Sequence, residues 1–227
     1  MARKHGVYAT FMPKPIFGEN GSGMHCHQSL FKNGRNAFFD PKDKYNLSAE
    51  CKSYIAGLLT HAREFTCVTN QWVNSYKRLV PGYEAPVYVA WALRNRSSLV
   101  RVPLYKPGKV AATRIALRNP DPACNPYLAF AAMLGAGLKG IEENYVLPDP
   151  VEENIFKMGD DDFAKYGITS LPGSLYEATR ELEASALMKE ILGEHVHAEL
   201  VKNKIKEWDA YRMHVTQYEI DRYLPVL

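Results

Sequence analysis

The sequence predicts an α+β fold in which an antiparallel sheet packs against helices. Two observations support this prediction. Segments with alternating apolar residues, bounded by Gly, Pro and Asn, are frequent up to residue 118. Apolar residues at helical spacing dominate the chain after residue 126. Because there is no internal repeat and no low-complexity tract, we expect a single domain over residues 1–227. Its sheet and ligand-site segments would lie in 1–118 and its helical scaffold in 119–227.

The N-terminal region predicts a helix end followed by two strands. In residues 2–6 (ARKHG), basic residues precede Gly6, which is typical of the last turn of a helix and its C-cap. Residues 7–15 alternate enough to form a strand that two prolines end. A second strand is expected over 24–31, followed by a turn at 32–34, where Lys-Asn-Gly is a hairpin signal.

The middle of the chain predicts one helix, an ordered loop and two more strands. Leu47–Thr66 shows helical periodicity, and Ser48 is the expected N-cap. Residues 67–86 are rich in Asn, Pro, Gly and aromatic residues, which favours an ordered loop. Strands are expected around 88–102 and 110–118.

The remainder predicts a helical scaffold. The helix that begins at Pro126 is apolar nearly all round, so we expect it to be buried. A loop-rich acidic region spans 144–172. Ser174 and Glu177 form an S-x-x-E capping box at the start of the next helix. Three helices are expected in this last part, over 174–182, 186–208 and 217–223.

The composition is that of an ordinary globular protein, with 46% hydrophobic and 23% charged residues in 227. A formal net charge of +3 is too small to predict a nucleic-acid partner. The four cysteines are widely spaced, which favours free thiols in a reducing compartment. The chain contains neither a membrane-spanning apolar stretch nor the apolar core of a signal peptide. We therefore expect a cytoplasmic protein without a membrane partner.

The first candidate site is GENGSGMHCHQSL, residues 18–30. On a strand, His25, His27 and Ser29 share one face. The glycine loop before them lets backbone N–H groups approach a phosphate, and an imidazole can ligate a metal. The alternative is a hairpin with incidental histidines. The preceding KPIF segment and the later arginines favour a metal-phosphate site.

The second candidate is the loop NSYKRLVPGYEAPV, residues 74–87, which carries Arg78 and Glu84. A loop shaped by proline and glycine can hold a charged substrate and shield it from water. Taken alone, the loop is better explained as a surface turn with a solvated ion pair.

The third candidate is an arginine-rich region with Arg94, Arg96 and Arg101, followed by Lys109 in a glycine-containing turn. Further along, Arg114, Ala116 and Arg118 share one face of a strand. Arginines on neighbouring strands repel one another unless an anion lies among them, and guanidinium groups suit phosphate and carboxylate oxygens. A solvated basic face is the alternative.

These three segments, in this order, resemble the catalytic domain of type I glutamine synthetase. KPIFGENGSGMHCHQSL is similar to the family's ATP-binding signature, and NSYKRLVPGYEAPV and RNRSSLVRVP are similar to its substrate and nucleotide segments. NPDPACNPYLAFAAML and SLPGSLYEA are similar to its later scaffold. The resemblance runs nearly end to end and implies a glutamine synthetase catalytic-domain fold.

The resemblance also implies a reaction and roles for individual residues. ATP would phosphorylate the γ-carboxylate of glutamate, and ammonia would displace the phosphate to give glutamine, with Mg²⁺ or Mn²⁺ bound. Glu84 would close over the site and take a proton from ammonium. Glu84 and Arg96 are the implied catalytic residues. The implied glutamate-binding residues are Asn20, Gly21, Arg78, Glu84 and Arg118; those for ATP are His27, Ser29, Arg96, Arg101, Lys109 and Arg114; and His25 is the implied metal ligand.

Two departures from the family pattern predict little or no activity for this chain alone. The family motif R-I-E-L-R reads Arg114-Ile115-Ala116-Leu117-Arg118 here, so Ala116 occupies the position of a lost metal ligand. The resemblance covers the C-terminal part of the catalytic domain, without the N-terminal β-grasp domain or the family's further metal-binding glutamates.

Two other functions are consistent with the same residues. The chain could be a non-catalytic nucleotide-binding or assembly module of the same fold, or a γ-glutamyl ligase for another amine. We also expect self-association through exposed apolar surface. The family's ring oligomer would require the N-terminal domain as well.

Overall fold

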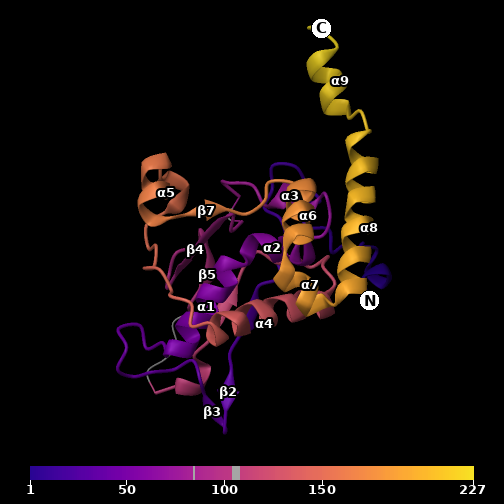
Figure 1. Cartoon of the computed structure of the whole chain (residues 1–227). Coiled ribbons are helices and arrows are strands. Elements are labelled where there is room, and N and C mark those ends of the chain that lie inside the picture. Colours follow the sequence, from indigo (N-terminus) through magenta and orange to yellow (C-terminus); the bar gives the residue numbers. More distant parts are fainter. Residues whose placement is uncertain (84, 104–107) are drawn as a thin grey trace.

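The computed structural model describes residues 1–83, 85–103 and 108–227 (Figure 1). Its main sheet has five strands. The spatial order of the strands is β1, β6, β5, β4 and β7. Their bounds are β1 Cys26–Gln28, β4 Tyr88–Ala92, β5 Ser98–Arg101, β6 Ile115–Leu117 and β7 Thr169–Ser170. A separate hairpin pairs β2 (Phe31–Lys32) with β3 (Arg35–Asn36). Its turn is the predicted one, because Asn33 and Gly34 adopt φ of 52° and 74°.

The α+β class is confirmed, but the sheet is mixed rather than purely antiparallel. Strands β4 and β5 run parallel, whereas the other described pairs in this sheet are antiparallel. A single strand over 88–102 was expected, and the chain instead turns back at 93–97. There the Asn95 side-chain oxygen accepts hydrogen bonds from Ser97 N–H and Ser97 Oγ. The sequence RNRSS contains neither Gly nor Pro, which are the strongest turn signals, so the turn was missed.

Helices cover the sheet and form the scaffold. The α-helices are α1 Ala49–Thr60, α2 Ala62–Thr69, α3 Ser75–Arg78, α4 Pro126–Glu142, α5 Asp160–Tyr166, α6 Leu175–Ala184, α7 Ala186–Leu192, α8 Glu194–Arg212 and α9 Gln217–Tyr223, and the 3₁₀ helices are η1 Ala2–His5, η2 Val110–Ala112 and η3 Ile155–Lys157. Ser48 caps α1 as predicted, since its side chain accepts a hydrogen bond from Cys51 N–H. Gly6 is a left-handed C-cap with φ of 66°. None of the described helices has the length and apolar character needed to cross a membrane.

The core lies between α1, α4 and the sheet. Tyr54, Ile55 and Leu58 of α1 are buried, as are Leu99 of β5 and Ile115 of β6. The four cysteines are also buried and free, as their spacing predicted. Burial raises the pKa of the Cys26 thiol to about 11, so this thiol has little tendency to ionise at neutral pH.

Further local predictions were wrong. The single helix expected over 47–66 is divided at His61 into α1 and α2. Residues 7–15 contain no strand in the described structure, and much of this segment is exposed. The helix expected over 186–208 breaks at Gly193, whose φ is 78°. The helix α4 is buried on one face only, because four apolar residues at helical spacing are exposed on the other: Tyr127 (84%), Phe130 (54%), Leu134 (44%) and Leu138 (38%).

Apolar residues are also exposed on α9, which extends away from the rest of the molecule (Figure 1). The exposed apolar faces of α4 and α9 are the kind of surface on which the expectation of self-association rests. The association itself stays a prediction.

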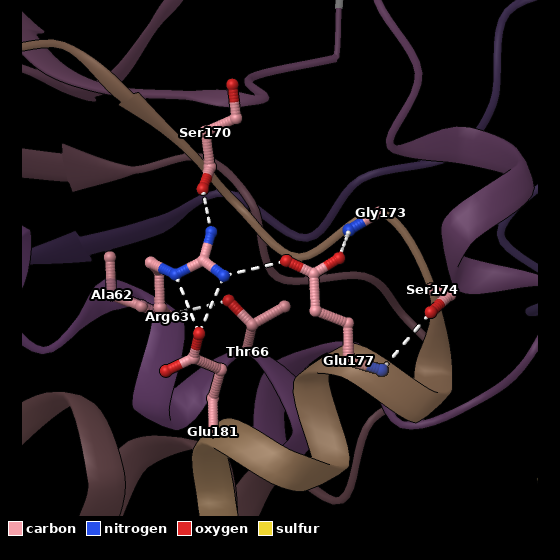
Figure 2. A network of polar contacts seen from close by, with 8 residues as sticks. All are labelled: Ala62, Arg63, Thr66, Ser170, Gly173, Ser174, Glu177 and Glu181. Carbon is pink, nitrogen blue, oxygen red and sulfur yellow. Dashed lines mark hydrogen bonds and ion pairs between the residues drawn. The ribbon is translucent and has the colours of Figure 1, made fainter.

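A network around Arg63 joins α2 to α6 and β7 (Figure 2). Arg63 Nη2 donates to Glu177 Oε1 at 2.7 Å and to Glu181 Oε1 at 2.6 Å. Another guanidinium nitrogen donates to the main-chain oxygen of Ser170. Glu177 also accepts a hydrogen bond from Gly173 N–H at 2.9 Å, and its own N–H donates to Ser174 Oγ. The predicted S-x-x-E signal therefore begins α6, with Glu177 bonding one residue further back than a capping box requires.

This network predicts a pH-dependent contribution to stability. Burial alone would raise the pKa of Glu177, but hydrogen bonds from Gly173 N–H and Arg63 outweigh it and lower the pKa. A depressed pKa in the folded state stabilises the fold above the unfolded-state pKa of about 4.3, and the stabilisation is lost as the pH falls through the folded-state value.

We therefore expect Glu177→Gln to lower the free energy of unfolding at pH 7, with a difference from wild type that shrinks towards pH 3. Denaturant unfolding across this range measures the difference. The matched control is Glu183→Gln, which removes an exposed carboxylate that pairs with Arg180 on the same helix. A Glu177→Gln deficit that is independent of pH would contradict the assignment.

Candidate ligand-binding site

Five of the predicted site residues line one cavity of about 450 Å³: Asn20, Gly21, His25, Arg78 and Arg118. They come from three regions of the chain: the glycine loop before β1, the short helix α3 and the segment after β6. Gly23, Tyr83 and Ala85 complete the described lining. The cavity thus brings together residues up to about a hundred positions apart in the sequence, as the hypothesis of a shared pocket required.

The guanidinium of Arg78 forms the inner wall of the cavity. This residue is only 5% exposed. Its Nη1 donates to Asn119 O at 2.6 Å and to Pro120 O at 3.2 Å, while Nη2 donates to Arg118 O at 3.1 Å. Burial lowers the pKa of Arg78, and the charge of Asp121 partly offsets this shift. Arg78 is therefore a buried cation that fixes the backbone beside the cavity, and not part of a solvated surface turn.

The glycine loop packs directly against Arg78. A Cβ atom on Gly23 would lie 2.4 Å from Arg78 Nη2, and one on Gly21 would lie 2.9 Å from Arg78 Cγ and 2.5 Å from Pro13 O. These two glycines are needed for close approach rather than for unusual backbone angles. The loop and the arginine thus define the shape of the cavity together.

Arg118 is held by main-chain oxygens on the neighbouring strand. It is 5% exposed, and its Nη1 donates to Ser98 O at 2.9 Å and to Arg96 O. Because both acceptors belong to the segment that begins β5, the sheet itself positions this guanidinium at the cavity wall.

Burial, together with the neighbouring arginines, keeps His25 from being protonated at neutral pH by lowering its pKa. Desolvation and the charges of Arg118, Arg78 and Arg101 lower its pKa to about 4. The imidazole of His25 is therefore neutral at pH 7, although the residue remains exposed. The pKa of His27 is also lowered, first by desolvation and then by the charges of Arg114 and Arg101. At neutral pH the two imidazoles therefore carry no charge, and the positive charge of the site comes from its arginines.

His27 and Ser29 line a second cavity of about 390 Å³ beside β1. Its other walls are mainly apolar and include Tyr54 of α1 and Met133 of α4. Arg114 Nε donates to His27 Nδ1 at 3.1 Å, so the predicted ATP-binding residues His27 and Arg114 are in direct contact.

The other predicted residues are more scattered. Arg96 is exposed and lines a third cavity of about 370 Å³ with Ser97 and Glu152. Arg101 is half-buried on β5, while Lys109 is exposed and belongs to none of these three cavities. Glu84 lies outside the described residues, so its predicted role stays a prediction.

Ala116 lies between Arg114 and Arg118, two positions from each, so the three residues share one face of the sheet. It is fully buried on β6 and pairs with His27 of β1 on one side and Arg101 of β5 on the other. Residues directly opposite in an antiparallel pair point to the same face of the sheet. Nε of Arg101 is buried there, and no described residue provides a hydrogen-bond partner for it.

The described residues do not by themselves fit a divalent cation. Such a cation requires several oxygen ligands with negative charge. His25 is adjacent to guanidinium groups, Ala116 offers a methyl group, and no described residues form a group of three or more candidate metal ligands. His25 thus remains a single candidate ligand among the described side chains.

Sequence reasoning missed the buried polar network that supports the cavity. Asn70, the C-cap of α2, donates to Asn119 O at 2.8 Å and to Asp121 Oδ2 at 3.0 Å. Asn119 Nδ2 donates in turn to Thr69 Oγ1 at 3.0 Å. Burial raises the pKa of Asp121 above its ordinary value, although its hydrogen bonds oppose this shift. A run of Asn, Asp and Pro reads as a loop, and nothing in its pattern shows that the loop is buried.

Comparisons with known proteins identify the family of this chain. Residues 1–223 match the protein family described as "Glutamine synthetase, catalytic domain". Glutamine synthetase of Methanocaldococcus jannaschii is 54% identical over 99% of this chain and 49% of its own length. Glutamine synthetase of Methanosarcina mazei is 54% identical over 100% of this chain and 50% of its own. The chain thus spans about half the length of the curated relatives it matches.

Solved structures show the same fold. A structure described as GmaS without ligand has a TM-score of 0.85 at 35% identity, and it covers 98% of this chain and 49% of the other. Glutamine synthetase of Plasmodium falciparum, determined by cryo-electron microscopy, gives 0.81 at 29% identity over 94% of this chain and 49% of the other. The chain belongs to the glutamine synthetase family, within its catalytic domain.

Proposed function

We propose that this chain carries part of the site for ATP-dependent ligation of glutamate and ammonia through γ-glutamyl phosphate. The family uses ATP and divalent metal ions. The observation that supports the proposal best is the 450 Å³ cavity, which joins the glycine loop to two buried arginines. Its size suits an amino acid, and its charge suits a dicarboxylate.

The chain's own residues would bind and orient the substrates. Arg118 is fixed by the carbonyl of Ser98, so its guanidinium can pair with a glutamate carboxylate without first being ordered. The glycine loop at Asn20 and Gly21 borders the same cavity and would contact the rest of the amino acid. Binding in a preformed cavity avoids much of the entropic cost of ordering the side chains.

The nucleotide would bind beside β1, at the second cavity. His27 and Ser29 border the second cavity, and Arg114 contacts His27. Arg101 and Arg96 would stabilise negative charge on the phosphoryl group, with Mg²⁺ or Mn²⁺ as the metal and Glu84 as the proton acceptor for ammonium. Phosphoryl transfer depends mainly on such positioning and charge stabilisation.

A second candidate function is a non-catalytic binding or assembly module. It is favoured by the methyl group of Ala116 and by the lack of a cluster of metal ligands in the described part of the chain. A γ-glutamyl ligase for another amine is a third candidate. The two archaeal relatives cited above are named glutamine synthetase, which favours ammonia.

Two measurements test these proposals. Calorimetry should show saturable binding of L-glutamate that Arg118→Gln abolishes, whereas Arg180→Gln, which removes an exposed arginine on α6, should leave it unchanged.

A γ-glutamyl hydroxamate assay with ATP and Mg²⁺ or Mn²⁺ should show little or no turnover by this chain alone. Robust turnover would refute the argument from the lost carboxylate, and no saturable heat with glutamate, or with ATP and metal, would favour the structural module.

A further inference from the structure

The side chain of Asn74 joins the start of α3 to a distant segment of the chain. Its Oδ1 accepts a hydrogen bond from Lys14 N–H at 2.7 Å, and its Nδ2 donates to Lys14 O at 3.0 Å. The two residues are 60 positions apart in the sequence. One side-chain amide therefore pairs with both the donor and the acceptor of a single residue, which fixes the course of the main chain at that point.

Helix capping does not explain the conformation of this side chain. Asparagine is favoured at the N-cap of a helix because its side-chain oxygen can accept from an N–H of the first turn. Asn74 is the N-cap of α3, but its side chain forms no capping hydrogen bond. The oxygen is directed to Lys14 instead, so the side chain of Asn74 serves the N-terminal segment rather than its own helix.

The segment that Asn74 holds has little else to fix it. Residues 7–20 contain neither helix nor strand, and all of them are exposed except Pro13, which is buried, and Lys14, which is half-buried. Segments with few buried contacts open locally at low cost in free energy. The contacts at residues 13 and 14 are therefore the ones that keep this part of the chain against the molecule.

Pro13 connects this anchor to the 450 Å³ cavity. Its carbonyl oxygen accepts a hydrogen bond from Ser22 N–H at 2.8 Å. A Cβ atom on Gly21, which lines the cavity, would lie 2.5 Å from the same oxygen and 2.9 Å from Arg78 Cγ. The glycine loop thus lies between the Pro13 carbonyl and the Arg78 side chain. Since Asn74 and Arg78 stand at opposite ends of α3, this short helix holds the loop from both sides.

We propose that Asn74 is a positioning residue for the amino-acid cavity. By holding Lys14 it fixes the Pro13 carbonyl, and with it the glycine loop, against Arg78. Asn74 is not part of the cavity lining, so it acts through the loop and not on the ligand. A loop that is already ordered lowers the entropic cost of binding. The inference rests on the proposed function in taking glutamate as the occupant of the cavity.

Hydrogen exchange of individual amides, followed by NMR on the whole chain without ligand, tests the hold on the loop. Asn74→Ala should speed exchange at Ser22 N–H at least about tenfold, because the segment loses two hydrogen bonds. Ser22 is diagnostic because its partner is Pro13 and not Asn74. An effect confined to the lost bonds would change exchange at Lys14 alone. Amides of α4 should exchange as in wild type.

The matched control is Gln71→Ala, which removes another side-chain amide from the same turn. Gln71 Nε2 donates to Ala123 O at 3.0 Å, and that oxygen also accepts from Trp72 Nε1 at 2.8 Å, so it keeps a partner in the variant. Exchange at Ser22 should stay as in wild type. Asn74→Asp is the second variant, because it keeps the acceptor for Lys14 N–H but sets a carboxylate oxygen against Lys14 O. It should also speed exchange at Ser22.

Calorimetry with L-glutamate then tests the consequence for binding. The dissociation constant should rise about tenfold in Asn74→Ala and stay unchanged in Gln71→Ala, while circular dichroism shows both to be folded. Wild-type exchange at Ser22 in both Asn74 variants, or wild-type glutamate affinity in a variant whose Ser22 exchanges faster, would overturn the proposal. Faster exchange at Ser22 in Asn74→Ala, in a chain that binds no glutamate, would refute the proposed function and support the hold of Asn74 on the loop.

Discussion

Replacement of Gly57 by alanine is expected to destabilise the fold by about 3 kcal/mol, because α1 and α4 cross with almost no space between their backbones. A Cβ atom on Gly57 would lie 2.2 Å from Ala136 O and 3.0 Å from Gly140 Cα. The obstacle is backbone, which cannot rotate away. Alanine normally stabilises a helix relative to glycine by about 1 kcal/mol. We expect the clash to outweigh this gain.

The same crossing gives a reciprocal test. A Cβ atom on Gly140 would lie 2.1 Å from Ser53 O and 2.8 Å from Gly57 Cα, so Gly140→Ala should be similarly harmful. The matched control is Gly173→Ala, whose nearest neighbour would be a Glu177 carboxylate oxygen at 3.7 Å. Denaturant unfolding measures all three variants. A Gly57→Ala protein as stable as the control would show that the helices do not cross this closely.

Replacement of Arg78 by lysine is expected to cost about 2–4 kcal/mol of stability and to abolish glutamate binding. The guanidinium donates to three successive carbonyl oxygens, those of residues 118, 119 and 120. A lysine ammonium is a point charge on a flexible chain and cannot reproduce this planar arrangement. The buried oxygens would lose donors, and the segment that carries Arg118 would lose its anchor.

The control for Arg78 is its neighbour Lys77, which is exposed and contacts the Tyr211 ring with its ammonium 5.6 Å from the ring centroid. Lys77→Gln should change stability by less than about 0.5 kcal/mol. Thermal unfolding and calorimetry with L-glutamate measure the two effects separately. Full stability of Arg78→Lys together with wild-type binding would contradict the role assigned to the buried guanidinium.

Local signals in the sequence predicted many of the local elements. Capping at Ser48, the hairpin turn at Asn33-Gly34 and the helix over 217–223 depend on short-range chemistry, and the structure confirms them. The parallel pairing of β4 and β5 was missed because a side-chain hydrogen bond from Ser97 to Asn95 creates the turn without Gly or Pro. Burial of α4 was overestimated because hydrophobicity alone does not show which faces have a neighbour.

The candidate site was predictable only in part. Alternation along the strand placed His25 near His27, and the glycine loop indicated a close backbone approach. That Arg78 would be buried against this loop depends on the fold of residues 118–121, about forty positions away. Long-range contacts of this kind leave no periodic pattern in the sequence. The family resemblance supplied the link between the three segments, and the 450 Å³ cavity supports it.

The central claim is that the glycine loop, Arg78 and Arg118 form one cavity for an anionic amino acid. A crystal structure of the chain grown with saturating L-glutamate tests it most directly. The account predicts density for glutamate in this cavity, with a carboxylate within hydrogen-bonding distance of the Arg118 guanidinium. An empty cavity at a concentration that calorimetry shows to be saturating, or glutamate bound elsewhere, would contradict the account.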